Sequence, residues 1–191
     1  MENLLQLKIN LEGIKPNIWR TVLVSNTSTV YELHHIIQIA FGWENYHAYS
    51  FSKNDSIYGN PILLDDETVI NDKEIFLHEL FEKRGTKINY EYDFGDGWIH
   101  SIALEDILPN DSKVKHPVCL EGERACPPED CGGTFGYSNL VNVMKNSKHP
   151  EHKEFVKWLG KPFDSESIDL VEVNKELKTI KNYIKAYEQE D

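Results

Sequence analysis

The chain begins with a strand-like pattern that passes directly into a helix-like one, and few folds accommodate that order. Over residues 5–11 every second residue is leucine or isoleucine and the residues between them are polar, which is the period of a half-buried strand. Gly13 interrupts this pattern, and a second extended run follows over 18–24, after Pro16. We therefore expect an N-terminal β-hairpin.

The strongest helix signal in the chain follows this hairpin. Thr29 can cap a helix, and Glu32 can complete a capping box three residues later. Hydrophobic residues then recur at the spacing of a buried helix face, and Gly42 stands where a left-handed C-terminal cap is expected. We expect His34 and His35, on the same helix, at solvated positions. The first third of the chain thus predicts a ββα unit.

The remaining patterns predict further strands and then helices. The expected strands are 47–51, 88–92 and 98–104, of which the last two form a second hairpin through a glycine-rich turn at 93–97. The expected helices are 75–81, 137–145, 150–159 and 168–187, and 52–73 is expected to be a long loop. The predicted fold class is α+β, with a mixed, mainly antiparallel sheet, helices packed on one side, and a helical C-terminal third.

Composition restricts the class of protein. A chain of 191 residues with 40% hydrophobic and 27% charged residues can bury a core, and we expect one domain over 1–191. No apolar stretch approaches the ~20 residues of a membrane helix, and the N-terminus lacks the pattern of a secretory signal. Three cysteines is an odd number, which favours a reduced, cytoplasmic setting over a disulfide framework.

The net charge of −12 argues against nucleic acid as a partner, because phosphates repel an acidic protein unless its cations gather on one face. The lysines are scattered, and the arginines are only Arg20, Arg84 and Arg124. We expect a protein or a small molecule as partner, and no membrane.

Four local motifs together resemble one known family. They are IKPNIWR at 14–20, LHHIIQ with the following GW at 33–43, YDFGDGW at 92–98 and CLEGERACPPEDCGG at 119–133. The chain resembles the plasmid pRiA4b ORF-3-like family from about residue 5 to about residue 177. The resemblance implies little about activity, although some members are labelled passenger proteins of an insertion element, which implies a resolvase.

The resolvase label finds no counterpart in the sequence. A serine recombinase needs an activated serine among arginines that neutralise phosphate charge, and the sequence has neither. One hypothesis that follows from the label is a mobile-element accessory protein that contacts DNA. This hypothesis predicts a clustered lysine face and binding that is lost as salt increases.

Three cysteines and a nearby histidine are candidate zinc ligands. They are Cys119, Cys126, Cys131 and His116. Thiolates and imidazoles suit tetrahedral zinc, and the prolines and glycines between them suit a loop that wraps an ion. His100 or His47 could instead supply the fourth ligand. The alternative is that the thiols are ordinary core residues, since the paired Cys-x-x-Cys spacing is absent.

Acidic residues and a histidine form a second candidate group. Its members are Asp93, Asp96, His100, Glu129 and Asp130. Such side chains could hold Mg²⁺ or Mn²⁺, or could act as acid and base in hydrolysis. The alternative is turn chemistry, because an aspartate before a glycine commonly bonds nearby main-chain amides.

A third set contains candidate ligand-binding residues. They are Arg20, Trp98, Arg124 and Tyr137. Tyr137 ends a glycine-rich segment ahead of a predicted helix, where free amides attract anions. The alternatives are core packing for the aromatic residues and carboxylate clamps for the arginines, for example Arg124 with Glu129.

Because no complete set of nucleophile, base and orienting group is visible, we favour a non-enzymatic module that binds a partner through the cysteine loop. The alternative is a metal-dependent hydrolase, which requires the acidic group and His100 to converge in one cleft.

Overall fold

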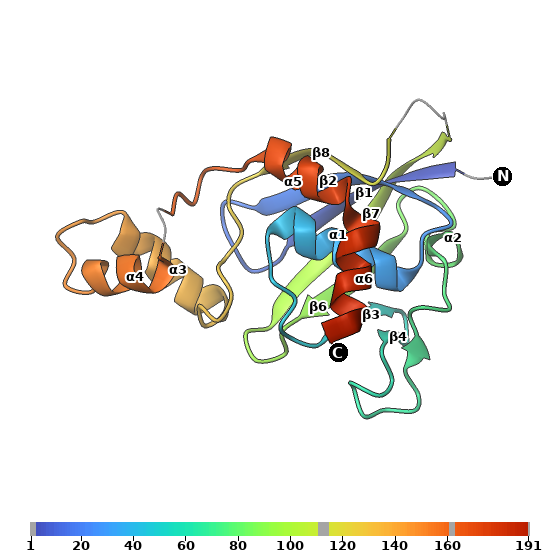
Figure 1. Cartoon of the computed structure of the whole chain (residues 1–191), viewed down its shortest axis with the longest axis horizontal. Coiled ribbons are helices and arrows are strands. Elements are labelled where there is room, and N and C mark those ends of the chain that lie inside the picture. The colour runs from blue at the N-terminus through green and yellow to red at the C-terminus, as the bar shows by residue number, and fades with distance from the viewer. Residues whose placement is uncertain (1–2, 111–114, 161–162, 191) are drawn as a thin grey trace.

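The computed structural model describes residues 3–110, 115–160 and 163–190 (Figure 1). Its strands are β1 Asn3–Leu11, β2 Ile18–Ser25, β3 Tyr49–Lys53, β4 Ser56–Gly59, β5 Ile70–Asn71, β6 Lys87–Tyr92, β7 Trp98–Pro109 and β8 Val118–Glu123. Its helices are α1 Val30–Phe41, α2 Leu77–Leu80, α3 Gly133–Met144, α4 His152–Leu159, α5 Leu170–Leu177 and α6 Ile180–Glu190.

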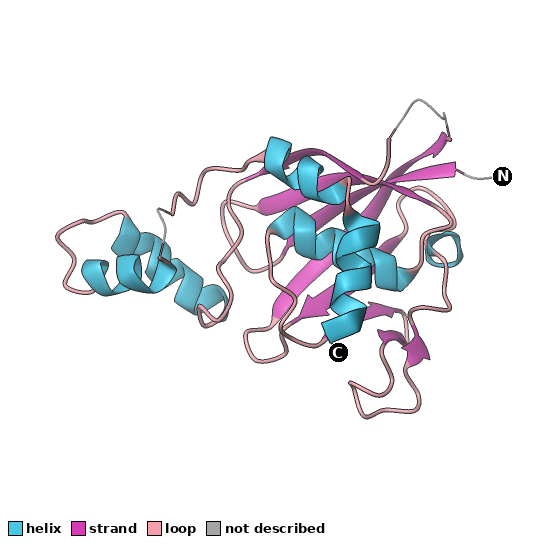
Figure 2. Cartoon of the chain, in the orientation of Figure 1, coloured by secondary structure: helices cyan, strands magenta, loops and turns pink. Residues whose placement is uncertain are grey.

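The described strands form one sheet in the order β5-β4-β3-β6-β7-β1-β2-β8, antiparallel except for the β4–β5 pair. Helix α1 packs on the sheet, and α5 and α6 contact α1 from outside (Figure 2). Helices α3 and α4 contact each other and lie beside the end of the sheet (Figure 1). The structure confirms the predicted α+β class with its mixed, mainly antiparallel sheet.

The ββα unit forms as predicted. Strands β1 and β2 pair antiparallel, and the alternate hydrophobic side chains of β1 are buried. The main-chain N–H of Glu32 donates to Thr29 Oγ1 at 3.1 Å, while the N–H of Thr29 donates to Glu32 Oε2 at 3.1 Å. Gly42 ends α1 with a φ of 79°, a left-handed conformation that costs glycine little.

Three secondary-structure predictions were wrong. The expected loop 52–73 contains β4 and β5, because Asn54 adopts a positive φ of 53° and closes a hairpin between β3 and β4. The cysteine-rich segment begins with a strand, β8, that pairs with β2 despite its polar sequence. The expected helix 168–187 is divided into α5 and α6, where Thr179 Oγ1 donates to the carbonyl of Glu176 and so competes with the helical hydrogen bonds.

The prediction of solvated His34 and His35 was also wrong, since both side chains are fully buried. His34 stacks on Tyr49 and hydrogen-bonds with Asn45 Oδ1 at 2.7 Å. His35 lies among tyrosine rings from α1 and α6, including Tyr31 and Tyr183. Helix α1 is covered by the sheet on one side and by α6 on the other, and that second layer is not visible in the local sequence.

Arg20 connects three parts of the fold. Its Nε donates to the carbonyl of Ala40 at the end of α1 at 2.8 Å, and its Nη1 donates to the carbonyls of Trp19 and Glu123 at 2.7 and 2.9 Å. Its Nη2 donates to the carbonyl of Arg124 at 2.8 Å. These contacts tie β2 to the C-terminus of α1 and to the end of β8, where a cation also complements the helix dipole.

Stability should fall on mild acidification, in part because of His35. Burial lowers the pKa of His35 from 6.5 to about 4, so between these values the unfolded chain binds a proton that the folded chain does not. Unfolding becomes more favourable as pH falls through this window, by roughly 1–3 kcal/mol for this group. We expect His35→Phe to flatten the pH dependence of the urea midpoint between pH 7 and pH 4.

The matched control is the exposed His78→Gln, which should leave the pH dependence as it is in the parent protein. An unchanged pH dependence in His35→Phe would show that other groups determine it.

Candidate functional site

One histidine and three carboxylates converge beside the β6–β7 turn. His47 Nε2 lies 3.2 Å from Asp130 Oδ1, 3.7 Å from Asp93 Oδ2 and 3.8 Å from Glu129 Oε2. His47 precedes β3, Asp93 begins the turn, and Glu129 and Asp130 belong to the segment between β8 and α3. We call these four residues the His47 cluster.

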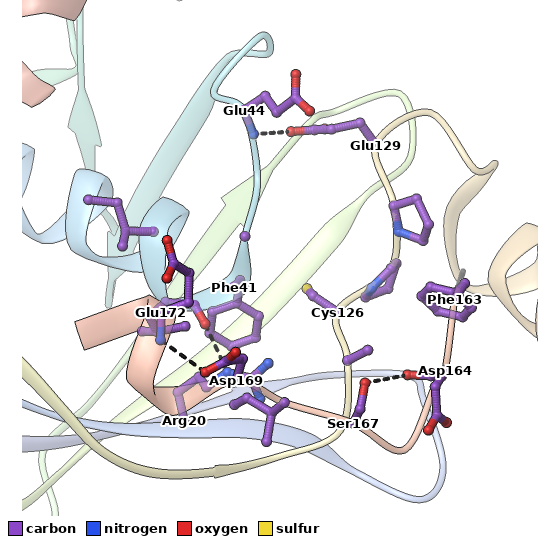
Figure 3. Close-up of a pocket in the computed structure, with 18 of the residues that line it drawn as sticks. Arg20, Phe41, Glu44, Cys126, Glu129, Phe163, Asp164, Ser167, Asp169 and Glu172 are labelled. Atoms are coloured by element: carbon purple, nitrogen blue, oxygen red, sulfur yellow. Dashed lines mark hydrogen bonds between the residues drawn. The ribbon is translucent and has the colours of Figure 1, made fainter. Parts of the chain in front are cut away.

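The backbone and neighbouring donors aim the carboxylates at His47. Asp93 and Asp130 both have a φ of 55°. Asp93 Oδ1 accepts a hydrogen bond from the N–H of Gly95 at 2.9 Å, so that its other oxygen, Oδ2, faces His47. Glu129 Oε1 accepts a hydrogen bond from the main-chain N–H of Glu44 at 2.9 Å (Figure 3). It also accepts one from the Tyr92 hydroxyl at 2.9 Å, so its Oε2 is the oxygen that faces the cluster.

The β6–β7 turn and the segment between β8 and α3, the two loops that carry the carboxylates of the cluster, are held together by hydrogen bonds and by a close main-chain approach. Asp96 Oδ2 accepts the N–H of Gly132 at 3.1 Å, and Trp43 Nε1 donates to the carbonyl of Pro127 at 3.0 Å. A Cβ at Gly133 would lie 2.6 Å from the carbonyl oxygen of Asp96, which is shorter than any normal contact. Asp96 is therefore a positioning residue. Only glycine at position 133 allows the main chain to come this close to the carbonyl of Asp96.

Two buried atoms of the cluster have no hydrogen-bond partner in the described chain: His47 Nε2 and Glu129 Oε2. Leaving such atoms unsatisfied is costly. Burial also raises the pKa of Glu129, against the lowering effect of its hydrogen bonds from Glu44 and Tyr92. Ligand atoms of His47, Asp93 and Asp130 all lie within 4.8 Å of one another, a spacing compatible with one ion at about 2.0–2.3 Å from each.

The predicted acidic group is brought together in part. Asp93, Glu129 and Asp130 join His47, which the sequence suggested only as a substitute zinc ligand, and Asp96 holds the adjoining loop. His100 lies elsewhere: it is buried in the core, and its Nδ1 bonds the carbonyl of Trp98 at 3.0 Å. Burial lowers the pKa of His100 to about 3.

The predicted zinc ligands do not gather as a ligand set within the described residues. Cys119 lies on β8, and its main-chain N–H and carbonyl both bond the side-chain amide of Asn174, each at 2.8 Å. All three thiols are free. Burial raises the pKa of Cys119 to about 11 and that of Cys131 to about 12, which opposes the thiolate form that zinc needs. Zinc at Cys119, Cys126, Cys131 and His116 stays a prediction.

The predicted ligand-binding residues are mostly enclosed. Trp98 and Tyr137 are buried, and the donors of Arg20 go to main-chain carbonyls, so a ligand role for them stays a prediction. The alternative of a carboxylate clamp for Arg124 is confirmed, but its partner is Glu166 and not Glu129. Arg124 forms a bidentate pair with Glu166, at 2.8 and 3.1 Å, whereas Glu129 accepts hydrogen bonds from Tyr92 and Glu44.

Comparison with known proteins places the chain in a family. It belongs to the plasmid pRiA4b ORF-3-like protein family, whose model matches residues 3–172, and this confirms the resemblance seen in the sequence motifs. The matched region contains all four residues of the His47 cluster.

Two individual relatives span most of the chain. The uncharacterized protein y4hQ of Sinorhizobium fredii (strain NBRC 101917 / NGR234) is 34% identical over 175 residues, covering 91% of this chain and 90% of the relative. The crystal structure of the protein of unknown function MM3350 from Methanosarcina mazei Go1 is 36% identical and superposes with a TM-score of 0.79, covering 89% of this chain and 97% of that one. Within the described part of the chain, no helix has the length and apolar character needed to cross a membrane.

The contact between the two loops makes Gly133→Ala a test of the site architecture. Its matched control is Gly97→Ala, because Gly97 has nearly the same φ (67° against 65°) but no atom within 4 Å of an added Cβ. Both substitutions incur backbone strain, and Gly133→Ala should cost roughly 1–3 kcal/mol more because of the added clash. Urea unfolding measures the difference, and equal losses would argue against the close contact.

Proposed function

We propose that this protein is a binding module whose functional centre is a divalent metal ion, held by His47, Asp93 and Asp130 with Glu129 beside it. The observation that carries the proposal is the buried His47 Nε2, which lies within 4 Å of three carboxylates and has no hydrogen bond. A protonated imidazole offers one N–H at this nitrogen and can serve one carboxylate, whereas a metal ion can serve all of them.

The donor set favours a first-row transition ion. Carboxylate oxygens alone suit Mg²⁺ or Ca²⁺, while an imidazole nitrogen among carboxylates suits ions such as Zn²⁺ or Mn²⁺. Such an ion would also offset the repulsion among the three carboxylates. Tyr92 and the main-chain amide of Glu44 would act as outer partners by orienting Glu129.

The direct test is metal binding by Asp130→Asn. Asp130 is mostly exposed, with 70% of its side-chain surface accessible, and asparagine tolerates its positive φ, so this variant should fold. We expect the parent protein, purified without an affinity tag, to bind Zn²⁺ or Mn²⁺ at about one ion per chain. Calorimetric titration should show affinity at least about tenfold lower in Asp130→Asn.

The control is Cys126→Ser, which should bind the ion as the parent protein does. Loss of metal in Cys126→Ser with retention in Asp130→Asn would move the site to the cysteines. Absence of binding in the parent protein would reject the proposal.

A second candidate is metal-assisted hydrolysis, favoured because Glu129 also lines a cleft of about 590 Å³. An ion held by only three protein ligands, His47, Asp93 and Asp130, would keep a coordination position for the attacking water. We expect ion-dependent cleavage of p-nitrophenyl phosphate or p-nitrophenyl acetate that is lost in Asp130→Asn. Activity that is equal in the variant would assign it to a contaminant or to another site.

A further inference from the structure

The cleft beside the His47 cluster has an aromatic wall. Trp158 on α4 and Phe163 after α4 line it, around an open space that Figure 3 shows between α5 and the segment after β8. Phe41, at the end of α1, also belongs to the lining but is buried beneath the Arg20 guanidinium. Trp158 is 47% exposed. Aromatic faces at a solvent-open site attract cationic side chains as well as apolar ones.

Carboxylates surround the same space. Those that line it are Glu44, Glu129, Asp164, Asp169, Glu172 and Glu176. Among the described residues of this lining, the one cationic side chain is Arg20, which is 2% exposed and donates to main-chain carbonyls. The surface that a ligand would meet is therefore negative, within a protein whose net charge is −12.

Trp158 also lines a second hollow of about 350 Å³, on the side of Asp130 and Cys131. Glu151, Glu154 and Phe155 complete its lining, so this hollow again combines acidic and aromatic side chains. Helix α4 buries none of its side chains, and Val156 is 43% exposed. The apolar side chains of α4 are thus accessible to a partner.

We propose that the two hollows on either side of Trp158 form one docking groove for a basic segment of a partner protein. A lysine or arginine of that segment would enter the cleft between carboxylates and aromatic rings, and neighbouring apolar side chains would pack on α4. Charge complementarity determines this choice, because nucleic acid and a second copy of this acidic chain would both be repelled. The proposal goes beyond the metal site and does not require an ion.

The test uses fluorescence anisotropy with a short fluorescein-labelled peptide of alternating arginine and leucine. The cleft variant is Glu44→Gln with Glu176→Gln, two exposed carboxylates outside the His47 cluster; Glu172 is left in place because it pairs with Lys175. The control is Asp55→Asn with Glu67→Gln, two exposed carboxylates that are not part of the cleft lining, so that the two variants carry the same net charge. Peptide affinity should fall roughly fivefold or more in the cleft variant and less than about twofold in the control.

Trp158→Ala should weaken binding as well, with circular dichroism confirming that the fold is retained. Equal losses of peptide affinity in the cleft and control variants would mean that binding depends only on the overall charge of the protein, and would overturn the proposal. Equal binding of a glutamate–leucine peptide would overturn it too, as would self-association in analytical ultracentrifugation that Trp158→Ala abolishes, since the groove would then hold a second copy.

Discussion

The fold depends on one buried cation, the guanidinium of Arg20, which is hydrogen-bonded to main-chain carbonyls and not to a carboxylate. Arg20 is almost fully enclosed, and its guanidinium donates to the carbonyls of Trp19, Ala40, Glu123 and Arg124. Removing the side chain would leave these acceptors unsatisfied on three separate elements. Lysine could not replace it, because a single ammonium lacks the planar fork that reaches them. The segment that carries Glu129 and Asp130 starts from this anchor, so the geometry of the site is determined partly by a residue outside it.

The parts of the fold that could be predicted are those determined by neighbouring residues. The capping box of Thr29 and Glu32 and the turn at Asp93 are local, and both formed as expected. The error about His34 and His35 came from a layer added by a distant segment. His34 and His35 look polar in sequence, yet α6 packs over a helix that already faces the sheet. A second face of apolar residues on α1 would have predicted that another helix covers it. In this protein that face is made of histidine and tyrosine side chains, which look polar in sequence.

The carboxylates of the candidate site were predictable from the sequence, and the place of His47 among them was not. Asp93, Glu129 and Asp130 stand in loops with turn residues, where functional carboxylates are expected. His47 joins them only because β3 pairs with β6, which brings its N-terminal end beside the turn. The misplacement of His100 was avoidable: Trp98 and His100 are two apart on a predicted strand, so the alternation that buries the one also buries the other.

The amide of Asn174 has a consequence for how the molecule behaves at high concentration. Strand β8 is the last in the sheet, and such an edge offers unpaired main-chain groups to any other chain. Asn174 presents a carbonyl and an NH₂ to the N–H and carbonyl of Cys119, as an adjacent strand would. A helix side chain thereby occupies the position where a foreign strand would begin to add, and protects this edge against intermolecular β-sheet growth.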